Sequence, residues 1–222
     1  ILMNEKIYAE QLYNGEIKID IDNLSRDINI LVRYCYQVLG FKKQQIVKYI
    51  DKYLYRNLDF YNDSLWYDNI LKYISQAKNK PLTNISEIEI TQKEIDIIKA
   101  LNNINQEKLL FTYLCLAKYN NKLRDINNNW VSTSHKVVKK LANINVNWNK
   151  YAKLMYIFKE AGLITLSKSA TNECVNFIDN DGEPIIIITM LDNLGFQYAK
   201  SIINNKKIGI CTHCGKFFRK SA

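Results

Sequence analysis

The strongly apolar segment at residues 104–121, INQEKLLFTYLCLAKYNN, constrains the fold more than any other part of this sequence. A helix that is apolar around most of its circumference must lie in a protein core or in a membrane. The uninterrupted apolar run is well short of the about 18 residues that a membrane span needs. We therefore predict a helix at the centre of a hydrophobic core.

The composition is typical of a folded protein without a membrane-spanning segment. At 222 residues, 47% of them hydrophobic, the chain can form one large domain or two small ones. Seven Gly and two Pro are too few for a disordered or fibrous protein. No apolar run can span a membrane and no signal peptide is recognisable, so we expect no membrane partner. Three of the five cysteines lie in apolar segments, which favours a reducing, cytoplasmic location.

Positive charge is concentrated in one part of the chain. The net charge is +9, and residues 131–172 carry seven Lys against one Glu. Two thirds of the excess charge therefore lies in less than a fifth of the sequence. A local surplus of this kind directs the search for a polyanion-binding surface to this segment.

Residues 1–80 are predicted to form a β-hairpin followed by a helical module. Asn14-Gly15 is a preferred pair for a tight hairpin turn, so residues 6–22 are predicted as the hairpin. Residues 24–54 indicate two helices that meet at Gly40, the first with Ser25 as a possible N-cap, and a third helix is expected at 64–80. About fifty of these residues weakly resemble the helical C-terminal module of some primases and replication proteins. An ordinary helical bundle is the alternative.

Residues 81–91 are polar, contain Pro81 and are predicted to be a linker. The domain that follows is expected to span residues 92–205 and to begin with a capping-box pair, Thr91 and Glu94. After the apolar helix in the sequence, we expect a short strand and then a helix that is capped by one of the hydroxyl residues 132–134. A second helix ends at Gly162, and two strands and a further helix near residues 192–204 follow. The predicted buried stripe of the second helix consists of Trp148, Tyr151, Ala152, Met155 and Phe158.

This order of elements, with the phrase FKEAGLITLSK at residues 158–168, closely resembles a winged helix over residues 105–179. The resemblance implies that the second helix enters the major groove of double-stranded DNA. Asn can pair with adenine, and Lys contacts guanine or phosphate. The candidate DNA-binding residues are Lys136, Lys139, Lys140, Asn149, Lys150, Lys153 and Lys168.

A protein-interaction adaptor is the main alternative. Lysine-rich exposed helices are common, and residues 131–172 contain no Arg, the better bidentate reader of guanine. Such an adaptor would bind a recombinase, a helicase or another replication protein with little DNA contact.

The sequence offers no recognisable catalytic site, and we expect that the protein is not an enzyme. It lacks a phosphate-binding loop, a dinucleotide fingerprint and the H-E-x-x-H pattern. His135 is expected to lie at the surface, and His213 to point away from a metal. The acidic stretch at 179–183 is expected to be a turn, because Met190 stands where a calcium loop needs Glu.

The C-terminal residues 206–222 resemble the first half of a zinc ribbon. Cys211 and Cys214 have the spacing of one zinc knuckle, and Gly215 permits the tight turn that follows them. A structural zinc site needs four ligands, so this truncated knuckle is expected to bind zinc only when further ligands are supplied, as in a full-length protein.

We therefore expect an α+β, predominantly helical protein. It would comprise an N-terminal helical module, a winged-helix domain and a truncated zinc-ribbon knuckle. Its expected role is accessory DNA binding in a phage or mobile element, in replication initiation, transcription control or recombinase steering.

Overall fold

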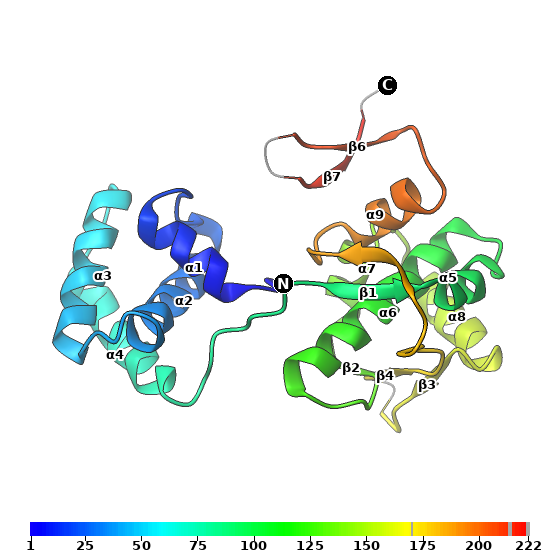
Figure 1. The fold of residues 1–222 in the computed structure, drawn as a ribbon, viewed down its shortest axis with the longest axis horizontal. Coiled ribbons are helices and arrows are strands. Elements are labelled where there is room, and N and C mark those ends of the chain that lie inside the picture. The colour runs from blue at the N-terminus through cyan, green and yellow to red at the C-terminus, as the bar shows by residue number, and fades with distance from the viewer. Residues whose placement is uncertain (170, 213–214, 221–222) are drawn as a thin grey trace. The chain divides into compact units, whose positions relative to one another are not determined.

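The computed structural model describes residues 1–169, 171–212 and 215–220. The chain is α+β and mostly helical, and it forms two compact units (Figure 1). The N-terminal unit comprises residues 2–84, and the C-terminal unit comprises residues 85–222 together with Ile1. The division falls inside the segment 81–91.

The N-terminal unit is a small helical bundle. Its core is built from buried aliphatic side chains of α1 to α4, among them Leu12, Leu31, Ile50 and Ile70. Gly40, with a φ of 67°, reverses the chain between the second and third helices. The elements are α1 (Glu5–Asn14), the 3-10 turn η1 (Ile21–Asn23), α2 (Leu24–Gln37), α3 (Lys43–Asn57) and α4 (Asp63–Ala77).

The hairpin predicted for residues 6–22 is wrong, because α1 is a helix. Asn4 caps it, its side chain accepting a hydrogen bond from the amide of Ile7 at 2.9 Å. Ala9 and Leu12 lie one helical turn apart and are both buried. Gly15, with a φ of 75°, ends the helix in the left-handed conformation. The Asn-Gly pair therefore marks a helix C-terminus here. The expected cap at Ser25 is also wrong: Asn23 occupies the N-cap position of α2, and Ser25 lies within its first turn.

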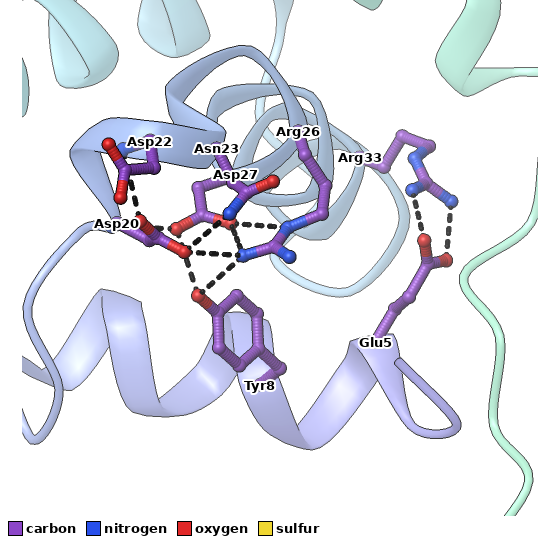
Figure 2. Close-up of polar contacts among 8 residues, drawn as sticks. All are labelled: Glu5, Tyr8, Asp20, Asp22, Asn23, Arg26, Asp27 and Arg33. Atoms are coloured by element: carbon purple, nitrogen blue, oxygen red, sulfur yellow. Dashed lines mark hydrogen bonds and ion pairs between the residues drawn. The ribbon is translucent and has the colours of Figure 1, made fainter. Parts of the chain in front are cut away.

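Two polar networks hold α1 against α2 (Figure 2). The guanidinium of Arg33, 1% exposed, donates two parallel hydrogen bonds of 2.8 Å to the carboxylate of Glu5. The buried Asp27 carboxylate accepts from the Tyr8 hydroxyl at 2.8 Å and from the Arg26 Nε at 2.9 Å. Because each buried charge has hydrogen-bonded partners, these contacts fix where α1 lies on α2.

The C-terminal unit is arranged around α6. Its strands form three small antiparallel sheets: β1 with β5, β2-β4-β3, and β6 with β7 (Figure 1). The elements are β1 (Ile88–Thr91), α5 (Gln92–Lys99), α6 (Ile104–Arg124), β2 (Trp130–Val131), α7 (His135–Leu141), α8 (Trp148–Glu160), β3 (Ile164–Leu166), β4 (Glu173–Val175), β5 (Pro184–Ile188), α9 (Leu194–Ser201), β6 (Ile208–Ile210) and β7 (Phe217–Arg219).

The prediction of a buried central helix is confirmed. Thirteen of the 21 residues of α6 are buried, and they include the continuous run from Leu109 to Tyr119. α5, α7, α9, β1, β2 and β4 all contact this helix. Within the described parts of the chain, no helix is long and apolar enough to cross a membrane.

The segment 81–91 is not entirely a linker, because its last four residues form β1. β1 pairs with β5 in antiparallel register, Ile88 opposite Ile188 and Ile90 opposite Ile186. The capping box is present: the Glu94 carboxylate accepts from the Thr91 amide at 2.9 Å. The Glu-Ile alternation at 87–90 is a strand signal, which the polar residues that precede it obscured.

A close contact between α9 and the end of α7 gives the first prediction. A Cβ atom on Gly195 would lie 1.8 Å from the backbone oxygen of Ala142, which cannot move without disturbing α7. We expect Gly195→Ala to lower the free energy of unfolding by about 3 kcal/mol, the upper end of the usual cost of overpacking. Urea denaturation measures this loss. Ser201→Ala, at an exposed position of the same helix, is the control. Equal stability of the two variants would contradict the close contact between Gly195 and Ala142.

Candidate nucleic-acid interface

Three elements of the basic segment and its flanks, β2, α7 and β4, pack on α6. From α6 to β4 the elements follow the order helix, strand, helix, helix, strand, strand. The sheet has β4 in its centre, with β2 and β3 on either side, all antiparallel. Gly162, with a φ of 70°, ends α8 and turns the chain into β3.

α8 buries one face and exposes the other. Its buried residues are Tyr151, Met155 and Phe158, which recur at helical spacing. The side chain of Asn147 caps the helix by accepting from the Lys150 amide at 2.9 Å. The opposite face is exposed, and it carries Asn149 and Lys153.

The predicted site residues lie on three elements. Asn149, Lys150 and Lys153 are together on the exposed part of α8, where the two lysines line a hollow of about 240 Å³ beside the start of α6. Lys136 and Lys140 are exposed on α7. Lys168 is exposed in the segment between β3 and β4. The structure therefore brings the α8 residues together, with the other lysines on the neighbouring helix and hairpin.

Lys139 differs from the other predicted lysines because it is partly buried. Its Nζ donates to the backbone oxygen of Val146 at 3.3 Å and lies 5.8 Å from the centre of the Tyr151 ring. These contacts tie α7 to the turn before α8. The side chain therefore has a structural role that the other predicted lysines lack.

Trp148 is not part of the buried stripe that the sequence predicts. It is 59% exposed, and Ala152 is exposed as well. Its indole ring stacks on the imidazole of His135, with 5.4 Å between the ring centres. The helical period alone could not separate this edge position from the core, because tryptophan fits both.

The sequence analysis did not predict a polar cluster that includes His135, the first residue of α7. The Nε2 of His135 lies 2.8 Å from Oε1 of Glu173, whose side chain is 1% exposed. The hydroxyl groups of Tyr151 and Tyr113 are hydrogen-bonded to each other nearby. His135 and Glu173 line a hollow of about 280 Å³ together with Trp148 and other α8 residues. His135 is thus half-buried and paired with Glu173, and no short sequence motif links these two residues.

Burial controls the ionisation of Glu173. The second carboxylate oxygen, Oε2, is buried and makes no hydrogen bond to the described residues. Removal from water raises the pKa of Glu173 above its usual value, and the contact with His135 opposes this shift only in part.

The C-terminal residues form the hairpin β6–β7. Within its turn, the Cys211 amide donates to the Lys216 oxygen and the Gly215 amide donates to the Cys211 oxygen, both at 2.9 Å. Cys214 and His213 lie outside the described residues. Among the residues that are described, no three His, Cys, Asp or Glu side chains come together as metal ligands.

The buried carboxylate predicts a pH-dependent stability. The folded protein binds the Glu173 proton more tightly than the unfolded chain, so the contribution of Glu173 to stability falls as the pH rises above 4.5 towards the raised pKa. Glu173→Gln removes this titration. We expect urea denaturation to show the wild type losing stability relative to the variant as the pH rises above 4.5. Glu160→Gln, an exposed change on α8, is the control, and a pH-independent difference for Glu173→Gln would contradict the assignment.

No protein-family model, curated protein or solved structure matches this chain.

Proposed function

We propose that the C-terminal unit binds double-stranded DNA as a winged helix formed by α6 to β4. The element order and the β2-β4-β3 sheet support this arrangement. In it α8 is the recognition helix, α7 precedes it across the DNA backbone, and the β3–β4 hairpin is the wing.

One observation carries the proposal. Asn149, Lys150 and Lys153 project from the exposed face of α8, and no described acidic side chain forms an ion pair with either lysine. A helix face with an amide and unpaired cations suits the major groove, where base edges and phosphates accept hydrogen bonds.

Each side chain has a distinct task in this proposal. Asn149, in the first turn of α8, reads an adenine through paired hydrogen bonds, while Lys150 and Lys153 contact guanine or phosphate. Lys136 and Lys140 on α7 bind the phosphates on one side of the groove. Lys168 binds the backbone from the wing. Lys139 contributes mainly charge, because its ammonium group already donates to a carbonyl.

The biological role proposed is that of an accessory protein in a phage or mobile element. Replication initiation, transcription control and recombinase steering all require a module that locates a DNA site, and this unit would supply it. The β6–β7 hairpin would add a zinc knuckle through Cys211 and Cys214 where further ligands complete the four that zinc requires. Zinc there would fold and rigidify the ribbon, and it would take no part in a reaction.

The exposed lysines of α8 give a direct test. We expect Lys150→Glu/Lys153→Glu to weaken binding to a labelled duplex by at least tenfold at moderate salt, because two attractive contacts become repulsive. Fluorescence anisotropy across a salt series measures it. The slope of the log–log salt plot should also decrease by about 2, one unit for each lost phosphate contact.

Lys72→Glu/Lys78→Glu is the matched control. These two lysines are exposed in the N-terminal unit, so the double change alters the net charge by the same amount. Equal losses in both double variants would attribute binding to overall charge and would refute the α8 interface.

The exposed aromatic side chains of α8 favour one alternative. Trp148 is 59% exposed, Tyr156 60% and Ile157 40%. Aromatic residues of this kind are enriched in protein interfaces. An adaptor that binds a recombinase, helicase or other replication protein through this helix would show no duplex binding even at low salt. It would lose its partner with Trp148→Ala/Tyr156→Ala and keep it with the lysine variant.

A further inference from the structure

The N-terminal unit contains a groove that combines aromatic rings with basic side chains. It lies between the C-terminal end of α1, the segment after it, and α3, and it encloses about 550 Å³. Its lining includes three tyrosines and three cations but no acidic residue. The residues that define it are Tyr13, Lys18, Tyr49, Lys52, Tyr53 and Arg56.

The three tyrosine rings form a continuous row. The centres of the Tyr13 and Tyr49 rings are 5.1 Å apart with 28° between their planes, and those of Tyr49 and Tyr53 are 6.1 Å apart with 27°. All three side chains are half-buried. The three side chains also pack against the hydrophobic core of the N-terminal unit, which holds the row in place. Flat aromatic rings that line a groove suit a planar ligand.

Three basic side chains line the groove beside this row. Lys52 and Arg56 are one turn apart on α3, and Lys48 extends the same stripe by another turn. Like charges at this spacing repel each other. In the described parts of the chain, neither Lys18, Lys52 nor Arg56 forms an ion pair with a carboxylate. An anionic ligand would relieve this repulsion.

We propose that this groove binds single-stranded nucleic acid. Unpaired bases would lie against the tyrosine row, which a duplex cannot do because its bases are already stacked and paired. The phosphates would contact Lys18, Lys52 and Arg56, and Lys48 would extend the path. Aromatic rings next to a basic track are what sequence-tolerant binding to single strands requires. The enclosed volume is of the size of a small-ligand pocket and takes one or two nucleotides.

The helix networks position one side of the groove without any ligand. Tyr13 lies on α1, whereas Tyr49 and Tyr53 lie on α3, so the row exists only when α1 is correctly placed. The pairs Glu5–Arg33 and Tyr8–Asp27 fix α1 on α2 (Figure 2). A preformed site of this kind avoids the free-energy cost of ordering its side chains on binding.

This site is independent of the proposed duplex-binding surface, because it lies in the other unit. The test therefore uses the full chain with Lys150→Glu/Lys153→Glu, which removes the α8 contribution. Fluorescence anisotropy would measure binding of labelled oligo(dT) and oligo(U) of about 12 nucleotides, the size of a typical single-strand site. A hairpin duplex of the same charge is the comparison ligand.

We expect the background protein to bind the single strands at low salt at least tenfold more tightly than the duplex. Adding Lys52→Glu/Arg56→Glu should weaken single-strand binding at least tenfold. Adding Lys72→Glu/Lys78→Glu, of equal charge, should change it less than twofold. A preference for oligo(dT) or oligo(U) would identify the natural strand as DNA or RNA.

The aromatic contribution is tested by Tyr13→Ala and Tyr13→Phe, with circular dichroism to verify folding. The phenylalanine variant should retain most of the affinity, because the ring remains. Absence of single-strand binding in the background protein, or equal losses in the two charge-reversal variants, would overturn the proposal whatever the stability of the tyrosine variants. Binding only of acidic peptides by the groove would also overturn it.

Discussion

The buried ion pair between Lys118 and Glu94 holds together four segments of the C-terminal unit. The ammonium group of Lys118 lies 2.7 Å from Oε1 of Glu94, and it also donates to the backbone oxygens of Glu89 and Asp179. The Glu94 carboxylate in turn accepts from the amides of Thr91 and Asp179. One pair of charges thus joins α6, α5, β1 and the chain that leads to β5. Burying these charges is tolerable because hydrogen bonds satisfy both of them.

The same principle of fully partnered buried charges operates in the N-terminal unit. Arg33 is buried beside Glu5, and Asp27 beside Tyr8 and Arg26. Each network connects a helix surface to a segment distant in the sequence, where apolar packing alone would leave the angle between helices less defined. The exposed lysines of α8 and the cations beside the tyrosine row form no ion pair with any carboxylate that the structure describes. The contrast separates charges that determine the fold from charges available for binding.

The sequence predicts the elements whose signals are local. The apolar run of α6, the left-handed Gly162 after α8 and the capping box at Thr91 each depend on neighbouring residues, and the structure contains all three. The errors concern contacts that are remote in sequence. Asn14-Gly15 suits both a hairpin turn and a helix C-terminus, and the burial of Ala9 and Leu12 against other helices decided for the helix. β1 needed a partner almost 100 residues away.

The candidate sites show the same division. Exposed lysines on an amphipathic helix follow from its periodicity, so the sequence could place Lys150 and Lys153 but could not show that Lys139 is tied to the Val146 carbonyl. The pairing of His135 with Glu173 joins residues 38 positions apart. The tyrosine row requires α1 to lie beside α3, which a predicted hairpin could not provide. A groove made by two helices becomes visible only when both helices are assigned correctly. For this reason the error at residues 6–22 concealed the groove as well as a fold element.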